Sequence, residues 1–314
     1  MMLKKTKIFL KTIPVAGAFL IWIRDRLTET RLASERRAFK KQYPLHQCGV
    51  NQKQRAIPVI VSLTSIKPRL KMVPLCIRTL LSQSFRPDKV VLWLSEYDMH
   101  GNKVISRDHL PRELLNLTKK GLDIRFCKDI GPYRKLIPAL KEFPDAVIVT
   151  ADDDAIYPKD WLEKLYVSYQ SDPGSIHCYR PRLISFNSDG KIDGYLKWNL
   201  DFQKPKRSFL IFPLGVNGVL YPPHALNDEI FNEDVFLEFC PKADDIWFKA
   251  MSLQNNTCCR KVCLESERPL LIPGSQVVSL FSENEYRNDE KIDAVFKKYG
   301  LCEKLLNINL GISK

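Results

Sequence analysis

The 314-residue sequence lacks long uncharged apolar segments, since no stretch of roughly 18 residues is both apolar and free of charge. This absence excludes a protein with several membrane-spanning helices. The 13 glycines and 20 prolines follow no repeat, which excludes a collagen-like chain. No Cys-x-x-Cys pair occurs, and the spacing of the nine cysteines matches no common zinc site. Because the cysteines are odd in number and scattered, we expect free thiols and a reducing compartment.

The net charge of +13 is confined largely to the N-terminus. Residues 1–56 contain 13 basic and 3 acidic residues, whereas residues 57–314 contain 36 and 33. A body that is nearly balanced in charge argues against a nucleic-acid partner. We therefore divide the chain into a basic arm, residues 1–56, and one globular domain, residues 57–314.

Within the arm, the uncharged and mostly apolar segment Thr12–Ile23 lies between clusters of lysine and arginine. Twelve residues are too few to cross a bilayer, but cations beside an apolar helix favour an anionic membrane surface. We expect peripheral membrane contact through residues 1–41, at the cytoplasmic, inner face of the membrane. An ordinary packed helix, and a signal peptide or short anchor, are the alternatives that the sequence leaves open.

The first part of the body alternates between two hydrophobic patterns. Short runs rich in β-branched residues predict buried strands, and apolar residues at helical spacing predict helices between them. The strands are expected at 59–64, 90–94, 122–126 and 146–150, and the helices at 71–84, 111–120 and 136–143. This rhythm predicts an α/β domain with a mainly parallel sheet flanked by helices. The remainder reads as irregular, with helices expected near 161–171, 244–254 and 289–299.

Ligands of parallel sheets bind at the carboxyl ends of the strands, so the segments that follow the strands are the candidate site. The fourth strand is followed directly by Asp152, Asp153 and Asp154. Adjacent carboxylates raise one another's pKa, and a hard divalent cation that is shared with phosphate oxygens relieves their repulsion. The alternative is an acidic, solvated turn that caps the helix beginning near Pro158.

Several segments resemble nucleotide-sugar glycosyltransferases of the A-type fold, most closely the family-2-like bacterial enzymes of lipopolysaccharide or capsule synthesis. The resemblance spans roughly residues 57–300 and rests on Val149–Pro158 with Trp161–Leu162, Val61–Ser65 with Pro68–Arg69, Leu80–Ser84, and Asp129–Lys135. It implies a Rossmann-like A-type fold, with a nucleotide-binding half at 57–155 and an acceptor-binding half at 156–314.

The resemblance also implies roles for individual residues. Asp154 and Asp152 would bind Mn²⁺ or Mg²⁺, with Asp153 beside Asp154 at the diphosphate and Asp152 also at the ribose. The donor would be a nucleotide-sugar, with a UDP-sugar favoured. The remaining nucleotide contacts would come from Thr64, Ser65, Arg69, Ser95, Glu96 and Lys135.

A second acidic pair, Asp244–Asp245, precedes an apolar helical face. In inverting A-type enzymes an acidic pair at this place supplies the general base, so the resemblance implies Asp245 as the base and Asp244 as the second candidate. The alternative is an N-cap, because aspartate is a favoured capping residue.

The acceptor side is indicated by a glycine-containing segment with Gly215, Asn217 and Gly218, which resembles the loop beside the acceptor pocket. A tight turn between two strands is the alternative. Tyr195, Trp198 and Phe212 either stack on sugars or pack in the core, with the core favoured. The segment Asn284–Asp289 resembles a C-terminal segment that closes over the nucleotide.

These features together predict a metal-dependent glycosyltransferase, inverting, that transfers a sugar to a glycan or lipid-linked acceptor in surface polysaccharide synthesis. A nucleotidyltransferase is the nearest rival, but that class begins with a glycine-rich phosphate loop after the first strand, and Ser62–Arg69 contains no glycine. A catalytically silent glycan- or nucleotide-binding protein is the rival from another class.

Overall fold

The computed structural model describes residues 14–204, 206–262, 270–275 and 287–312, with side chains described from Arg26 onward. The chain forms two compact units, Met1–Pro44 and Leu45–Lys314. The described part of the first unit is one continuous helix, α2 (Pro14–Gln42). Within the described residues no helix combines the length and the apolar character that a membrane crossing needs. Residues 1–13 of the basic arm and residues 284–286 of the C-terminal segment lie outside the described residues.

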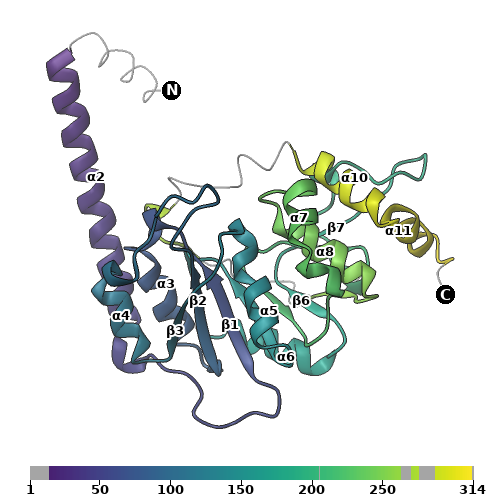
Figure 1. Ribbon diagram of the computed structural model, residues 1–314, viewed down its shortest axis with the longest axis horizontal. Coiled ribbons are helices and arrows are strands. Elements are labelled where there is room, and N and C mark those ends of the chain that lie inside the picture. The colour runs from purple at the N-terminus through teal and green to yellow at the C-terminus, as the bar shows by residue number, and fades with distance from the viewer. Residues whose placement is uncertain (1–13, 205, 263–269, 276–286, 313–314) are drawn as a thin grey trace. The chain divides into compact units, whose positions relative to one another are not determined.

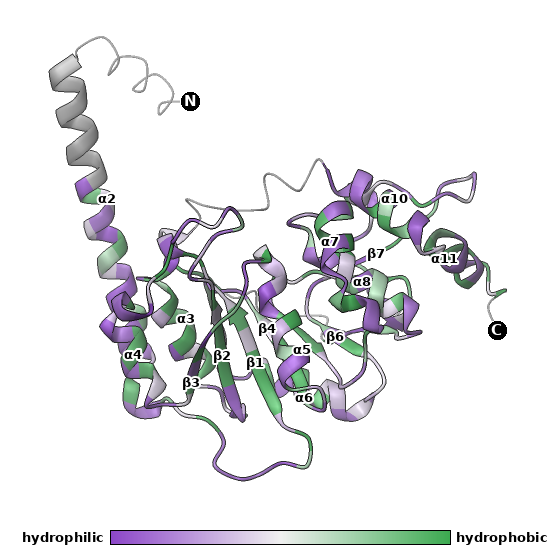
Figure 2. Cartoon of the chain, viewed as in Figure 1, coloured by the Kyte–Doolittle hydropathy of each residue, from purple (hydrophilic) through white to green (hydrophobic). Residues whose placement is uncertain are grey.

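The four strands expected in the first half of the body are present. They are β1 (Val59–Thr64), β2 (Lys89–Leu94), β3 (Leu122–Phe126) and β4 (Val147–Ala151). They pair in parallel in the order β3-β2-β1-β4. Figure 1 shows β3, β2 and β1 side by side, and Figure 2 also labels β4. Their carboxyl ends therefore meet at one edge of the sheet.

The connecting helices are shorter than expected. They are α3 (Val73–Leu80), α4 (Arg112–Thr118) and α5 (Ile137–Glu142). Helix α3 ends early because Gln83 and Ser84 hydrogen-bond to the Pro158–Lys159 loop instead of continuing the helix. Helix α5 follows a five-residue 3-10 segment, Gly131–Lys135, which occupies the turn where a longer helix would begin.

The same sheet continues with strands of mixed direction, in the order β4-β10-β6-β11-β8. Strands β6 and β11 run parallel to the first four, whereas β10 and β8 run opposite. Two small sheets, β12-β5 and β7-β9, complete the second half. The strand bounds are β5 (Ala155–Ile156), β6 (Ile176–Cys178), β7 (Pro181–Leu183), β8 (Arg207–Ser208), β9 (Ile211–Pro213), β10 (Val219–Tyr221), β11 (Cys259–Lys261) and β12 (Leu270–Leu271).

This arrangement confirms the expected class: an α/β fold with a mainly parallel sheet flanked by helices and an irregular second half. Its helices in the second half are α6 (Trp161–Ser171), α7 (Glu233–Phe239), α8 (Asp244–Gln254), α10 (Asn288–Lys298) and α11 (Leu301–Asn309). Helices α7 and α11 were not predicted. An Asn232 cap, which accepts a hydrogen bond from the Val235 amide, begins α7, and a left-handed Gly300 separates α11 from α10.

Both faces of the central sheet are buried. Along β1, Val59, Val61 and Leu63 point to one side and Ile60 to the other, and all are at most 3% exposed. Parallel strands covered on both faces read as continuous apolar runs, which is why these strands could be recognised from sequence. Figure 2 shows the hydrophobic colour concentrated along β1 and on α3 beside it.

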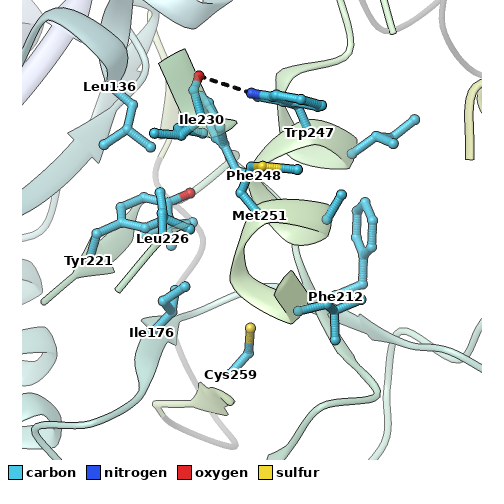
Figure 3. Close-up of a cluster of buried hydrophobic side chains, with 14 of the residues drawn as sticks. Leu136, Ile176, Phe212, Tyr221, Leu226, Ile230, Trp247, Phe248, Met251 and Cys259 are labelled. Carbon is cyan, nitrogen blue, oxygen red and sulfur yellow. Dashed lines mark hydrogen bonds between the residues drawn. The ribbon is translucent and has the colours of Figure 1, made fainter. Parts of the chain in front are cut away.

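The largest core cluster joins one face of the sheet to α5, α8 and α10. Figure 3 shows part of it, where the indole N–H of Trp247 donates to the Ile230 carbonyl at 3.1 Å. Tyr195, Trp198 and Phe212 belong to this core and contact one another edge-on or tilted, so core packing describes these aromatics. The eight described cysteines are free thiols, and Cys263 lies outside the described residues.

Candidate active site

The 3-10 segment Gly131–Lys135 links the end of the sheet to the second half of the domain. In β1, the Ser62 hydroxyl donates to the Lys135 carbonyl at 2.6 Å and accepts from the Trp93 indole at 2.9 Å. From the same segment, the Tyr133 hydroxyl donates to the Cys240 carbonyl at 2.5 Å, just before α8. The segment is therefore fixed to β1 at one side and to the end of α7, just before α8, at the other.

The ammonium group of Lys135 lies between two acidic groups that are far apart in the sequence. Its Nζ is 2.8 Å from Asp244 Oδ2 and 3.6 Å from Asp152 Oδ1. Burial lowers the pKa of Lys135, but the carboxylates of Asp244, Asp152 and Asp245 more than offset this, so the pKa is raised. Lys135 was expected near the nucleotide; the structure places it as a bridge between the triplet after β4 and the pair that begins α8.

The three adjacent aspartates have different surroundings. Asp153 is 6% exposed, and its carboxylate accepts from the Ser65 hydroxyl and from Arg69 Nη1, each at 2.5 Å. Arg69 Nη1 also lies 3.2 Å from Asp154 Oδ2. Burial raises the pKa of Asp153, and Arg69 and Ser65 oppose that rise. Ser65, Arg69 and Asp153 thus hold the loop after β1 against the end of β4.

Asp152 and Asp154 are half-buried at the rim of this cluster. The Asp152 amide donates to the Tyr157 hydroxyl at 2.8 Å, and the Asp154 carbonyl accepts from the Ile272 amide at 2.7 Å. The bond to Ile272 adjoins the small β12-β5 sheet, which fixes the backbone just after the triplet. Burial raises the pKa of Asp152 to about 6; Lys135 opposes the rise, and Asp154 and Asp244 add to it.

Asp245 is half-buried at the start of α8 and faces the turn that follows β9. Its Oδ2 accepts from the Gly215 amide at 2.9 Å. Burial and the neighbouring Asp244 raise the pKa of Asp245 to about 7, whereas Lys135 and the Gly215 amide oppose the rise. A carboxylate with a pKa near neutrality can take up and release a proton under ordinary conditions.

The acidic pair does not form the N-cap of α8, which was the alternative role expected from the sequence. The N-cap residue of α8 is Ala243, and no side chain caps the helix. Asp244 and Asp245 lie in the first turn, where negative charge is favourable beside the helix N-terminus. Asp244 is buried and paired with Lys135, which leaves Asp245 as the more accessible carboxylate.

The glycine-containing segment divides into two parts. A Cβ at Gly215 would lie 2.7 Å from Lys135 Nζ and 2.8 Å from Asp245 Oδ1, so this glycine belongs to the acidic site. Asn217 and Gly218 have positive φ angles and form the turn into β10. The Asn217 carbonyl accepts from the Trp161 indole at 2.7 Å, and a Cβ at Gly218 would lie 2.5 Å from that ring.

The other expected nucleotide contacts lie at the ends of β1 and β2. The Thr64 hydroxyl donates to the Trp93 carbonyl at 2.9 Å, and the Ser95 hydroxyl donates to the Tyr97 carbonyl at 2.7 Å. Glu96 is 3.4 Å from Arg107. A separate cleft of about 370 Å³ at the ends of β2 and β3 is lined by Ser95, Glu96, Tyr97, Asp98, Arg107, Phe126, Cys127, Lys128 and Asp129.

The site has an excess of negative charge that a divalent cation could offset. The five carboxylates of Asp152, Asp153, Asp154, Asp244 and Asp245 face two cations, Arg69 and Lys135, which leaves a net charge of −3 when all are ionised. In the described part of the chain no three His, Cys, Asp or Glu side chains converge as a metal cage. Mg²⁺ sites that also use substrate phosphates need only one or two carboxylates, and Asp152 and Asp154 at the rim fit that requirement.

Three contacts of the site were not expected from the sequence: those of Ser62, Tyr133 and Tyr157. Ser62 and Tyr133 fix the Lys135 segment, and Tyr157 holds the Asp152 amide. Each is an uncharged side chain within an apolar or aromatic context, so its pattern was typical of core. Of these three residues, only Ser62 has a recognisable signal in the sequence: a hydroxyl inside a buried strand needs a hydrogen-bond partner.

No protein-family profile matches the sequence, and no curated protein matches it. Among solved structures, TarS 1-349 of S. aureus is similar at a TM-score of 0.45 and 12% identity, over 81% of this chain and 91% of that one. The same protein in complex with UDP-GlcNAc is similar at 0.44 and 14%, over 82% and 74%. The inositol-1-phosphate CTP transferase from T. maritima is similar at 0.40 and 11%, over 78% and 98%.

The raised pKa of Asp245 predicts a specific dependence of stability on pH. Because the folded protein holds this proton more tightly than the unfolded chain, the Asp245 carboxyl lowers stability progressively as the pH rises from about 4 through about 7. Asp245→Asn removes this loss. We therefore expect the stability of the variant relative to wild type to increase over that pH range, as measured by urea denaturation.

The exposed pair of Asp160 with Lys164 offers a control for this measurement. Asp160→Asn removes a surface carboxylate and should change stability by less than about 1 kcal/mol. A stability difference between Asp245→Asn and wild type that does not change between about pH 4 and pH 7 would contradict the assigned environment of this carboxyl.

The close approach at Gly215 predicts that even one methyl group disturbs the site. Gly215→Ala forces the Lys135 ammonium or the Asp245 carboxylate to move, because both would lie under 3 Å from the new Cβ. We expect a loss of about 1–3 kcal/mol in the free energy of unfolding. Gly174→Ala, where nothing lies within 4 Å, is the matched control and should change stability by less than about 0.5 kcal/mol. Superimposable urea curves for Gly215→Ala and wild type would refute the prediction.

Proposed function

We propose that the protein is a metal-dependent glycosyltransferase that moves a sugar from a nucleotide-sugar, a UDP-sugar by preference, to a hydroxyl of a glycan or lipid-linked acceptor. One observation carries the proposal: Lys135 joins the acidic triplet after β4 to the acidic pair that begins α8. The joined site combines carboxylates that would hold a cation for a diphosphate with a carboxylate whose pKa is raised to about 7. An inverting transfer needs these two elements side by side.

On the donor side, Asp152 and Asp154 are the residues that would hold Mn²⁺ or Mg²⁺. A divalent cation bound there would offset the negative charge of the diphosphate leaving group. Arg69 and Lys135 supply fixed positive charge on either side of the triplet. Asp153 remains engaged with Ser65 and Arg69, so its role is to hold the loop after β1 in place.

On the acceptor side, Asp245 acts as the general base. Its carboxylate accepts the proton of the acceptor hydroxyl while that oxygen forms a bond to the anomeric carbon of the donor sugar. The bond between the anomeric carbon and the diphosphate oxygen breaks, and the diphosphate leaves with the electron pair. Attack from the face opposite the leaving group inverts the anomeric configuration. The Gly215 amide orients the Asp245 carboxylate for this step.

The proposal includes a setting for the reaction. The acceptor would belong to bacterial surface polysaccharide synthesis, and the basic arm would keep the enzyme at the inner face of the membrane. In α2, apolar residues Pro14–Ile23 occupy one end, and the basic residues Arg36, Arg37, Lys40 and Lys41 occupy the other. Charge of this kind favours anionic lipid headgroups by about 1 kcal/mol for each lysine or arginine near the surface.

We expect one variant of the site to lose nucleotide binding and a second variant to lose only turnover. Asp154→Asn should abolish the Mn²⁺-dependent binding of UDP and of a UDP-sugar, because it removes a cation ligand. Asp245→Asn should leave that binding intact and remove transfer, because it removes the base. The measurements are the thermal shift with UDP, GDP, CMP and their sugars, with and without Mn²⁺, and release of nucleotide from the sugar donor.

Asp160→Asn is the control for loss of a surface charge, and it should resemble wild type in both measurements. A well-folded wild-type protein that responds to no nucleotide would sink the proposal. Binding without turnover in the presence of a broad acceptor panel would favour the catalytically silent nucleotide-binding protein. Turnover of a nucleoside triphosphate with release of pyrophosphate would identify a nucleotidyltransferase.

The role of the arm is tested with the full chain and lipid vesicles. We expect the protein to sediment with vesicles that contain anionic phospholipid and to be released by salt. Replacement of Arg37, Lys40 and Lys41 by glutamine should weaken this binding roughly 10-fold or more. Equal binding to neutral and anionic vesicles would contradict an electrostatic contact.

A further inference from the structure

Arg182 lies on the acceptor side of the proposed site. It is the central residue of β7, directly opposite Phe212 of β9, and the Leu214 amide that follows β9 donates to the Arg180 carbonyl at 2.9 Å. The next residue after Leu214 is Gly215, which contacts the Lys135 and Asp245 side chains. The β7-β9 sheet therefore ends at the proposed general base.

The Arg182 guanidinium is buried without a counter-ion among the described residues. The residue is 8% exposed, and its Nε is buried and has no hydrogen-bond partner in the part of the chain that the structure describes. Nη1 donates to the Trp198 carbonyl at 3.1 Å, and the guanidinium carbon lies 4.5 Å from the centre of the Tyr195 ring. These contacts orient the guanidinium, but neither the carbonyl nor the ring carries a negative charge.

Three other buried cations near the sheet have carboxylate partners. Arg69 pairs with Asp153, Arg78 pairs with Glu113, and Lys135 pairs with Asp244. Burial of a charge without an opposite charge is costly, so an arginine in this state indicates that a ligand supplies the missing anion.

Lys249 is a buried cation whose neighbour is a thiol rather than a carboxylate. Its Nζ donates to the Cys259 sulfur at 3.6 Å, between α8 and β11. The single charged nitrogen of Lys249 therefore has an acceptor from the core, whereas in Arg182 only Nη1 has a core carbonyl as acceptor, and Nε has no partner among the described residues. This difference makes Arg182 the better candidate for a ligand contact.

Tyr195 shows that Arg182 and Asp245 share one electrostatic neighbourhood. Burial raises the pKa of the Tyr195 hydroxyl, and the Asp245 carboxylate raises it further. Arg182, through its charge and a hydrogen bond to this hydroxyl, and Arg180, through its charge, lower it. The tyrosine is thus close enough to feel the proposed base and both arginines, so a group bound at Arg182 would lie near the hydroxyl that Asp245 deprotonates.

We propose that Arg182 binds an oxyanion of the acceptor, either a carboxylate or a phosphate, and that the acceptor is therefore an acidic sugar. This inference rests on the proposed function for its assignment to the acceptor. The donor diphosphate already has Arg69, Lys135 and a cation site at the end of β4, whereas Arg182 belongs to the β7-β9 sheet. A guanidinium offers a planar fork that binds either oxyanion in two-point fashion.

Such a site would discriminate against neutral sugars, because a neutral sugar supplies no counter-ion for the Arg182 guanidinium. An acidic sugar would pair with the buried guanidinium, whereas a neutral sugar would leave it without a counter-ion. Sites with buried polar groups discriminate strongly against ligands that leave those groups unpaired. Arg182 would act as a specificity-determining and positioning residue, and proton transfer would remain with Asp245.

The test is a set of binding titrations with the full chain saturated with UDP and Mn²⁺. The probes are glucose 6-phosphate, glucuronate and glucose, and the proteins are wild type, Arg182→Gln, Arg182→Lys and the surface control Arg207→Gln. We expect wild type to bind one acidic probe roughly 10-fold or more tightly than glucose. Which acidic probe is preferred distinguishes a phosphate from a carboxylate. Arg182→Gln should lose the preference, Arg182→Lys should keep part of it, and Arg207→Gln should keep it fully.

Three outcomes would overturn the inference. The first is equal binding of glucose and both acidic probes to wild type. The second is an acidic preference that persists in Arg182→Gln. The third is competition between the acidic probe and UDP, or a loss of UDP affinity in Arg182→Gln, which would assign Arg182 to the donor.

The design also separates this inference from the proposed function. If UDP does not bind to wild type, the proposed function fails by itself, and an Arg182-dependent acidic preference would then establish an oxyanion site without an acceptor role. Thermal unfolding and circular dichroism of each variant show whether it is folded. Arg182→Lys retains the positive charge and the apolar stem, so it keeps the test decisive if Arg182→Gln does not fold.

Discussion

The site depends on one buried ammonium group. Asp152 follows β4 and Asp244 begins α8, and without a cation between them their carboxylates would repel each other in a poorly hydrated place. Lys135 lies within ion-pair distance of both. The backbone that carries this side chain is fixed, because the Lys135 carbonyl accepts a hydrogen bond from Ser62 of β1. The geometry of the proposed chemistry is thus set by the same β1 strand that forms the core.

The parts of the fold that could be predicted from sequence are those in which local pattern and tertiary packing agree. Strands β1 to β4 are buried on both faces, so their apolar runs are visible without knowledge of their neighbours. Helix α7 was missed because it is only seven residues long and its start depends on the Asn232 cap, while irregular segments surround it. The length of α3 was overestimated because contacts with the distant Pro158–Lys159 loop end it.

Several residues of the candidate site could be named from the sequence, but their partners could not, and Ser95 and Glu96 line a separate cleft. The position of the acidic triplet after a buried strand indicated that it faces a ligand, and the structure brings it together with Ser65, Arg69 and Lys135. The environment of Asp153 depends on side chains more than eighty residues away, and no local pattern encodes these contacts. For the glycine segment, the tight turn describes Asn217 and Gly218, whereas Gly215 approaches Lys135 and Asp245, and the acceptor role of the segment stays a prediction.

The charge of the site constrains how its ligands would enter. With five carboxylates and two cations, a diphosphate that arrives alone adds negative charge to a cluster that is already negative. Two responses reduce this repulsion: entry of the nucleotide together with a divalent cation, and protonation of Asp152 or Asp245, whose pKa values are raised to about 6 and about 7. A divalent cation would support departure of the diphosphate. Protonation of Asp245 would instead prevent this carboxylate from accepting a proton. Because the two compete for the same negative charge, cation binding would favour the ionised form of Asp245, and this coupling would link occupancy of the proposed donor side to the ability of the proposed base to accept a proton.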